Sequence, residues 1–290
     1  MTLNTNVQNV NLNLMTNPHA WLLKDLESVP QNGLKVMTTF SCGGGSSLGY
    51  KLAGCDVIAA NDIDTEMAYH YKLNLNPKYY FLCPIKDLLK QELPKELYTL
   101  DILDILDGSP PCSNFSMAGN REKDWGKDKH FREGQAKQIL DNLFFDWLDL
   151  VECLKPKVAI AENVKGLIQG NAKGYVKLIM ARFKTIGYNA QLFLVNAADC
   201  GVPQRRERVF FIALRNDIDK PKLILTPEHR WISAGEATND VQMLTDDEIR
   251  ETKPMPTDVK FWDKTKVGLD YSIACEKESG KGSFFQHRKL

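Results

Sequence analysis

The chain has 290 residues, of which 43% are hydrophobic and 26% are charged, a balance typical of a globular protein with a full core. Lys plus Arg and Asp plus Glu both number 37, which excludes a strongly basic nucleic-acid-binding protein; any such surface must come from local clustering. The seven scattered cysteines include no C-x-x-C pair, so we expect reduced thiols in the cytoplasm and no metal site. No apolar run is long enough to span a membrane, and the Asn/Thr-rich start does not resemble a signal peptide. We therefore expect no membrane partner.

The expected elements alternate between apolar strands and helices of 3.6-residue periodicity. In chain order they are a short helix (19–29), a strand (34–40), a helix over LGYKLAG, a strand (55–60), a helix (66–75), a strand (101–106), a long amphipathic helix (134–154), a strand (157–161), a helix (172–186) and two late strands that pair with each other (189–196 and 208–214). The long helix should bury Ile139, Leu143, Trp147, Leu148 and Val151. This order predicts an α/β fold with an open, mostly parallel sheet, helices on both faces and an antiparallel strand pair near its end. The pattern weakens from about residue 226, so we expect three parts, 1–33, 34–225 and 226–290.

A glycine-rich turn, SCGGGSS, separates the first strand from its helix, and the second strand ends in NDID. In open α/β sheets ligands bind at the carboxyl ends of strands, and an acid after the second strand can accept hydrogen bonds from ribose hydroxyls. The glycines alone would indicate only a tight turn, and Asp64 is better explained as the N-cap of the next helix. Turn and acid together predict an adenosine-type cofactor.

The stretch GSPPCSNFS places Cys112 directly after two prolines, at the end of an apolar run. Proline cannot continue a strand ladder, so the chain must leave the sheet there. A free cysteine is more often a small buried hydrophobe, the role expected for Cys55, Cys83, Cys153 and Cys200. Cys112 differs because a loop presents it at a strand end, which suits a nucleophile.

Two charged groups are expected at the same sheet edge. Glu162 follows the strand KVAIA and would be costly to bury as a merely structural residue. In QRRER, strand alternation points Arg206 and Arg208 to one face and Arg205 and Glu207 to the other. The alternative is a solvated strand end; otherwise two cations lie beside the carboxylate.

Five stretches occur in the order FSCGGGSSLGYKLAG, NDID, GSPPCSNFS, AENVKGL and GVPQRRERVFFIA. Together they resemble the cytosine-5 DNA methyltransferase family, whose cofactor is S-adenosylmethionine. The resemblance covers about residues 34–214, and PPC followed by ENV and QRRER is highly specific. It implies a Rossmann-like methyltransferase sheet in the catalytic domain (34–225) and the incomplete start of a hinge and target-recognition region (226–290).

The resemblance implies catalytic roles for Cys112, Glu162, Arg206 and Arg208. Carbon 5 of cytosine becomes nucleophilic only after a thiolate adds to carbon 6, which would be the task of Cys112. Glu162, with its pKa raised in a dry pocket, would protonate the ring nitrogen. Arg208 would hold the base's carbonyl oxygen and orient Glu162, with Arg206 in a supporting or phosphate-binding role. In a duplex the base must first be flipped out, and residues 113–133 match the mobile loop that closes over it.

The resemblance also implies the cofactor site. Phe40 would lie near the adenine, Gly44 and Gly45 at the methionine part, and Asp62 at the ribose, with Leu143 lining the pocket. The full set of cofactor-binding residues expected is Phe40, Ser41, Gly43, Gly44, Gly45, Asn61, Asp62, Ile63, Ile85, Pro110 and Leu143.

The chain departs from the family pattern at three positions. Cys42 replaces a glycine of the first turn, Ser113 follows the nucleophile in place of glutamine, and Cys83-Pro84-Ile85 lacks the aspartate that usually contacts the adenine. We expect that contact to be lost or replaced by backbone. None of these changes touches Cys112, Glu162 or Arg208.

The expected partner is duplex DNA, in a restriction-modification setting. The chain lacks most of the family's recognition region and the segments that follow it, so we expect either a shortened chain or a second polypeptide that carries that region. A tRNA-modifying relative and a non-catalytic binding or regulatory relative remain the alternatives.

Overall fold

The computed structural model describes residues 22–111, 128–129, 138–139, 142–169, 173–220, 222–226 and 230–238. The chain divides into two compact units, Met1–Trp231 and Ile232–Leu290. In the second unit the described helix is α7 (Ala234–Ala237), whose N-cap Ser233 accepts a hydrogen bond from the Glu236 backbone. None of the helices in the described ranges is long and apolar enough to cross a membrane.

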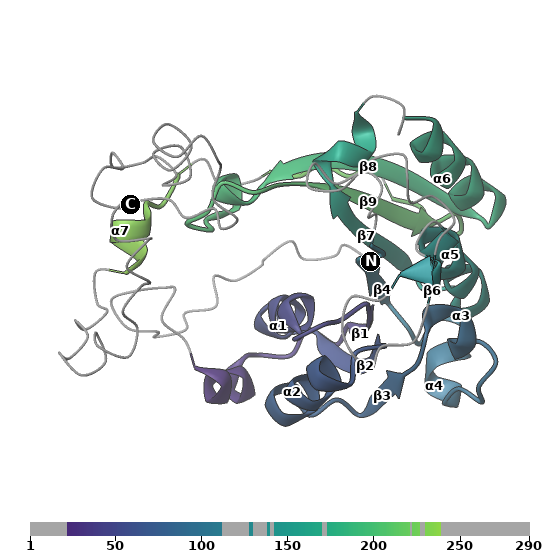
Figure 1. Ribbon diagram of the computed structural model, residues 1–290, viewed down its shortest axis with the longest axis horizontal. Coiled ribbons are helices and arrows are strands. Elements are labelled where there is room, and N and C mark those ends of the chain that lie inside the picture. Colours follow the sequence, from purple (N-terminus) through teal and green to yellow (C-terminus); the bar gives the residue numbers. More distant parts are fainter. Residues whose placement is uncertain are drawn as a thin grey trace. The chain divides into compact units, whose positions relative to one another are not determined.

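The first unit contains a seven-stranded sheet in the order β3-β2-β1-β4-β7-β9-β8 (Figure 1). Its strands are β1 (Lys35–Thr39), β2 (Asp56–Asp62), β3 (Tyr79–Leu82), β4 (Ile105–Gly108), β7 (Val158–Val164), β8 (Tyr188–Asn196) and β9 (Glu207–Arg215). The first five, β1, β2, β3, β4 and β7, are parallel to one another, whereas β9 pairs antiparallel with both β7 and β8. This arrangement confirms the predicted fold class. A separate antiparallel pair joins β5 (Asp128–Lys129) and β6 (Gln138–Ile139).

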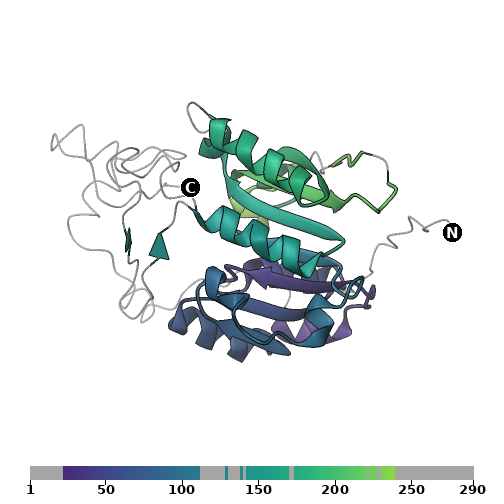
Figure 2. The ribbon, with the colours of Figure 1, turned by 90° about the vertical axis from the view of Figure 1, so that its right-hand side faces the viewer.

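Helices cover the sheet, and the apolar residues of the strands alternate between its faces. The helices of the first unit are η1 (Leu23–Ser28), α1 (Gly45–Leu52), α2 (Thr65–Leu75), α3 (Ile85–Leu88), α4 (Lys95–Tyr98), α5 (Leu143–Leu154), η3 (Lys165–Ile168), α6 (Lys173–Thr185) and η5 (Ala197–Cys200). Figure 2 shows α5 and α6 side by side over one face. There Met37 of β1 joins the main core, while the preceding Val36 packs with Val57 and with Tyr50 of α1.

The prediction of one long helix over 134–154 is wrong for its first half. Helix α5 begins at Leu143, and residues 138–139 form β6 instead. Ile139 continues the helical spacing, but pairing with Asp128 decides its backbone. The second half is confirmed, because Leu143, Trp147, Leu148 and Val151 are buried.

Strand limits also differ from the expected ones. Strand β4 begins at Ile105 rather than at residue 101, since Asp101 adopts a positive φ of 68° that a strand cannot contain. Strands β2 and β7 continue past their apolar runs to Asp62 and Val164. Among the cysteines expected to be buried, Cys55 is, whereas Cys153 and Cys200 are exposed.

A buried carboxyl group joins β4 to α1. Asp107 is 7% exposed, and its carboxylate accepts a hydrogen bond from the Tyr50 hydroxyl at 3.1 Å and another from Ser46. The pKa of Asp107 is raised to about 7, chiefly by burial and to a lesser extent by nearby Glu162, against the lowering effect of these two hydroxyls. Burial also raises the pKa of Tyr50, which therefore remains a donor.

We expect the stability of Asp107→Asn relative to the wild type to increase as the pH rises. The carboxyl is ionised in the unfolded chain above about pH 4 but stays protonated in the folded chain up to about pH 7. The folded wild type therefore binds more protons in this window, and its stability falls as the pH rises from 4 to 7. Asparagine keeps an acceptor for Tyr50 and does not titrate. In urea unfolding, the free energy of unfolding of the variant relative to that of the wild type should increase by about 2–3 kcal/mol between pH 5 and pH 8.

Equal pH dependence in the two proteins would show that Asp107 ionises normally.

We expect Asp64→Ala to lower the free energy of unfolding by about 1 kcal/mol. Asp64 is the N-cap of α2, as predicted, and its side chain accepts from the backbone of Glu66 at 3.0 Å and of Met67 at 3.1 Å. Alanine leaves these two amides without that acceptor. Denaturant unfolding at neutral pH measures the loss, and an unchanged midpoint would contradict the capping role.

Candidate active site

The candidate residues gather at the edge where the parallel strands end. The glycine turn follows β1, Asp62 ends β2, the GSPP segment follows β4, and Glu162 lies near the end of β7. Strand β9 runs in the opposite direction, so its first residues meet the end of β7. Carboxyl ends of parallel strands are the usual place for ligands in such sheets.

The glycine turn is held by Asp62. One carboxylate oxygen of Asp62 accepts from the Cys42 backbone at 2.7 Å, and the other accepts from Ile63 at 2.8 Å and Asp64 at 2.9 Å. Cys42 and Phe40 both have a positive φ, 44° and 53°, which is uncommon for residues with a side chain. A carboxylate offers about four acceptor positions, so Asp62 retains capacity for another donor.

The middle glycine of the turn faces the protein interior. Gly44 has a φ of 95°, and a Cβ built on it would lie 2.4 Å from Leu75, so only glycine fits. Gly43 and Gly45 differ, because a Cβ there would meet nothing within 4 Å. The turn therefore packs on α2 on one side and leaves open space over the other two glycines.

Other predicted cofactor residues are buried and support the carboxyl edge of the sheet. Asn61 is 1% exposed, and its amide donates to the carbonyl groups of Phe81 at 2.8 Å and Cys83 at 2.9 Å. Ser41 donates to the Asn61 carbonyl at 3.1 Å. Ile85 and Leu143 are both 2% exposed and belong to the main core. Asn61 thus fixes the Cys83-Pro84 segment in which the expected aspartate is absent.

The segment that leads to Cys112 is tightly fixed. A Cβ on Gly108 would lie 2.5 Å from the Trp147 indole nitrogen and 2.8 Å from the Thr39 hydroxyl, so the strand end requires glycine. Buried Asn163 donates to the Pro110 carbonyl at 3.0 Å. Pro111 is described, whereas Cys112 lies outside the described residues, as does the loop 113–133 apart from residues 128–129 of β5.

Glu162 and Arg208 form an ion pair, with 2.8 Å between the guanidinium Nε and the carboxylate Oε1. In the β7–β9 ladder Val164 lies opposite Arg208 and Glu162 lies opposite Phe210. Arg208 is therefore diagonal to Glu162 on the same face, within reach of a long side chain. Both side chains remain partly exposed, Glu162 at 31% and Arg208 at 24%.

Burial raises the pKa of Glu162, and the nearby cations Arg208 and Arg206 oppose this without reversing it. A carboxyl group with a raised pKa beside an arginine is better suited than an ordinary carboxylate to donate a proton and recover it. Arg206 itself is exposed, and its backbone N–H donates to the Asn196 side chain at 3.1 Å.

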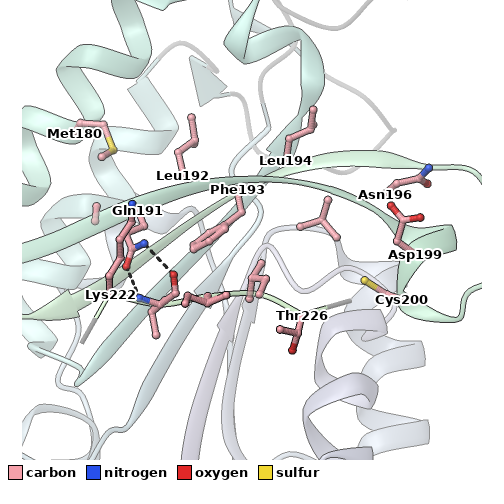
Figure 3. A pocket seen from close by; sticks show the side chains of 15 residues that line it. Met180, Gln191, Leu192, Phe193, Leu194, Asn196, Asp199, Cys200, Lys222 and Thr226 are labelled. Carbon is pink, nitrogen blue, oxygen red and sulfur yellow. Dashed lines mark hydrogen bonds between the residues drawn. The ribbon is translucent and has the colours of Figure 1, made fainter. Parts of the chain in front are cut away.

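A separate hollow runs along β8, the edge strand (Figure 3). Its walls include Leu192 and Leu194 together with residues 222–226. The Gln191 side chain accepts from the Leu223 backbone at 2.8 Å and donates to it at 3.2 Å, which occupies part of the free strand edge. The hollow does not include Glu162, and within the described ranges no group of three or more His, Cys, Asp or Glu could hold a metal ion.

Sequence reasoning missed two groups at this site. Asn163 stood in the recognised ENV stretch, and an amide at a position that alternates with the buried Ala159 and Ala161 was the available signal. Asp107 stood next to the proline loop, and the signal was an acid directly after an apolar run.

Comparisons with known proteins agree with one another. Residues 34–280 match the family model of the C-5 cytosine-specific DNA methylases. The type II methyltransferase M.FnuDI of Fusobacterium nucleatum is 33% identical over 64% of this chain and 48% of its own length. M.DdeI of Desulfomicrobium norvegicum is 32% identical over 77% of this chain and 52% of its own.

A crystal structure of a Spodoptera frugiperda DNMT2 mutant has a TM-score of 0.54 at 22% identity, over 74% of this chain and 61% of that one. This likeness concerns the fold. The chain spans about half the length of the curated relatives it matches. The family match nonetheless covers most of the sequence, from the glycine turn through the Glu162–Arg208 pair and beyond. The chain therefore belongs to the C-5 cytosine-specific DNA methylase family.

Proposed function

We propose that this chain transfers the methyl group of S-adenosylmethionine to carbon 5 of cytosine in duplex DNA, as part of a restriction-modification system. The observation that carries the proposal is the Glu162–Arg208 ion pair of 2.8 Å. It lies at the sheet edge where the segment before Cys112 also ends, and the pKa of Glu162 is raised there. An acid of this kind is what protonation of a cytosine ring nitrogen requires.

The residues at the carboxyl edge fit the cofactor. The space over Gly43 and Gly45 is open, Asp62 has acceptor capacity for ribose hydroxyls, and partly exposed Phe40 offers an aromatic ring beside the turn. When bound, S-adenosylmethionine supplies an electrophilic methyl group. Ile63 extends this set, Ile85 supports it from the core, and Asn61 contributes by fixing the Cys83-Pro84 backbone.

In the proposed mechanism the Cys112 thiolate adds to carbon 6 of the flipped base. Electron density moves to the ring nitrogen, where Glu162 donates a proton, and carbon 5 becomes the nucleophile. After methylation, loss of the carbon 5 proton expels Cys112. Arg208 holds the carbonyl oxygen of the base and keeps Glu162 in place, while Asn163 positions the Pro110 carbonyl just before the nucleophile.

The proposed substrate is duplex DNA, in line with the type II methyltransferases among the relatives. A second polypeptide, one of the two alternatives that the sequence left open, has no support in the comparisons, so the proposal concerns this chain alone. Methyl transfer to duplex DNA and to total tRNA should be measured side by side. Transfer to tRNA alone would replace the proposed substrate.

We expect Cys112→Ser to abolish methyl transfer while cofactor affinity stays within about twofold of wild type, because only the thiol is removed. Duplex DNA that contains 5-fluorocytosine should trap a covalent adduct with the wild type, since the fluorine cannot leave as a proton does. Denaturing electrophoresis reads the adduct. An adduct formed by the serine variant would refute the assignment of Cys112.

We expect Asp62→Ala to weaken S-adenosylmethionine binding by about 1–3 kcal/mol, the cost of losing hydrogen bonds to a charged acceptor. Asp64→Ala is the matched control, because it removes a neighbouring carboxylate that caps α2. Calorimetry should show weaker binding for Asp62→Ala only. Equal affinities for both variants would mean that Asp62 serves only to hold the turn.

A further inference from the structure

The connection between β8 and β9 carries an exposed arginine on an exposed tryptophan. The Arg205 guanidinium lies over the Trp231 ring, 4.7 Å from its centroid. Arg205 is exposed, and Trp231 is 47% exposed. A guanidinium stacked on an indole is held in one plane and still presents its N–H edge to solvent.

A hydrogen bond to η5 holds the tryptophan ring in place. Its indole N–H donates to the Asp199 carboxylate at 2.7 Å, and Asp199 lies on η5. The Asn196 side chain accepts from the backbone of Ala198 at 3.2 Å and of Arg206 at 3.1 Å. Both ends of the connection are therefore hydrogen-bonded to the same asparagine, and Arg205 immediately precedes one of these two donors.

The acids around Arg205 are engaged elsewhere. Glu207 pairs with Lys165 at 2.7 Å, Glu162 pairs with Arg208, and Asp199 accepts from Trp231. Among the described residues no carboxylate forms a salt bridge with Arg205. A preoriented cation without an acidic partner is suited to a planar, bidentate anion such as phosphate.

The short separation between Arg205 and Arg208, the partner of the proposed acid, also fits a nucleic acid. Arg205 precedes Arg208 by three residues, so their Cα atoms are at most about 10 Å apart. Phosphates recur about every 3.4 Å of helix axis along each DNA strand. A strand that delivers a base to Glu162 therefore carries several phosphates over a length comparable with the separation of Arg205 and Arg208.

We propose that Arg205, oriented by Trp231, binds a backbone phosphate of the DNA strand close to the target base. This inference rests on the proposed function, because it takes the substrate to be duplex DNA. Trp231 acts here as a positioning residue, and Arg205 makes the contact. The contact holds the strand in register and reads no sequence.

The test measures binding of a fluorescent duplex to the full chain at several salt concentrations. Arg205→Ala should weaken binding about equally for all sequences and lower the slope of log affinity against log salt by about 0.9, the value for one phosphate contact. Arg182→Ala is the matched control, because Arg182 is already neutralised by Asp149 at 2.9 Å and Glu152 at 2.5 Å. Its slope should equal that of the wild type.

Trp231→Ala separates orientation from charge. It keeps Arg205, so the slope should stay near the wild-type value while affinity falls about two- to fivefold, the size of an exposed cation–π interaction. Trp231→Phe keeps an aromatic ring and should bind within about twofold of the wild type. A larger loss in Trp231→Phe than in Trp231→Ala would contradict stacking as the cause.

If Arg205→Ala has the same slope of log affinity against log salt as the wild type, the inference is overturned. If that variant still methylates DNA, the proposed function stands even though the phosphate contact does not. A lowered slope in a chain that binds DNA but transfers no methyl group supports the phosphate contact and counts against the proposed function. A wild-type chain that binds no duplex counts against both.

Discussion

One reversed strand makes the Glu162–Arg208 pair possible. In a parallel sheet all strands begin at one edge and end at the opposite edge. The first residue of one strand therefore lies far from the last residue of its neighbour. Strand β9 is antiparallel, and its second residue, Arg208, lies opposite Val164 at the end of β7. A slip of one residue would move the Arg208 side chain to the opposite face, away from Glu162.

Neighbouring residues of like charge have different partners at this edge. Asp62 holds the glycine turn through the Cys42 amide, whereas Asp64, two residues later, caps α2. Likewise Arg208 pairs with Glu162, whereas Arg205 stacks on Trp231. Strand alternation and the turns between elements explain why these neighbours have different partners. Successive residues along the backbone point their side chains in different directions.

Buried polar groups surround the strand that leads to the proline loop. Asp107 connects that strand to α1, and Asn163 connects the loop to β7. The close approach of Trp147 to Gly108 closes the other face. Of these, Asp107 is costly, since its burial favours the protonated form. Natural proteins tolerate such costs mainly near functional sites.

The sequence by itself determined the alternation of strands and helices and the sheet edge at which the candidate residues meet. Hydrophobic periodicity marks buried faces, and the ends of parallel strands share an edge whatever their order. Periodicity was insufficient where few apolar residues supported it. Residues 134–142 therefore indicated a helix although 138–139 pair as a strand, and the apolar runs 55–60 and 157–161 left open how far the ladders of β2 and β7 continue into the polar residues after them.

The family resemblance already implied that Arg208 orients Glu162, but the contacts themselves follow only from the tertiary structure. The Glu162–Arg208 pair, the Asn163–Pro110 bond and the Asp107–Tyr50 bond join residues 46, 53 and 57 positions apart. Their contact depends on strand order and register, which local patterns do not encode. The stacking of Arg205 on Trp231 likewise required the chain after β9 to return to η5, and no spacing in the sequence indicates that return.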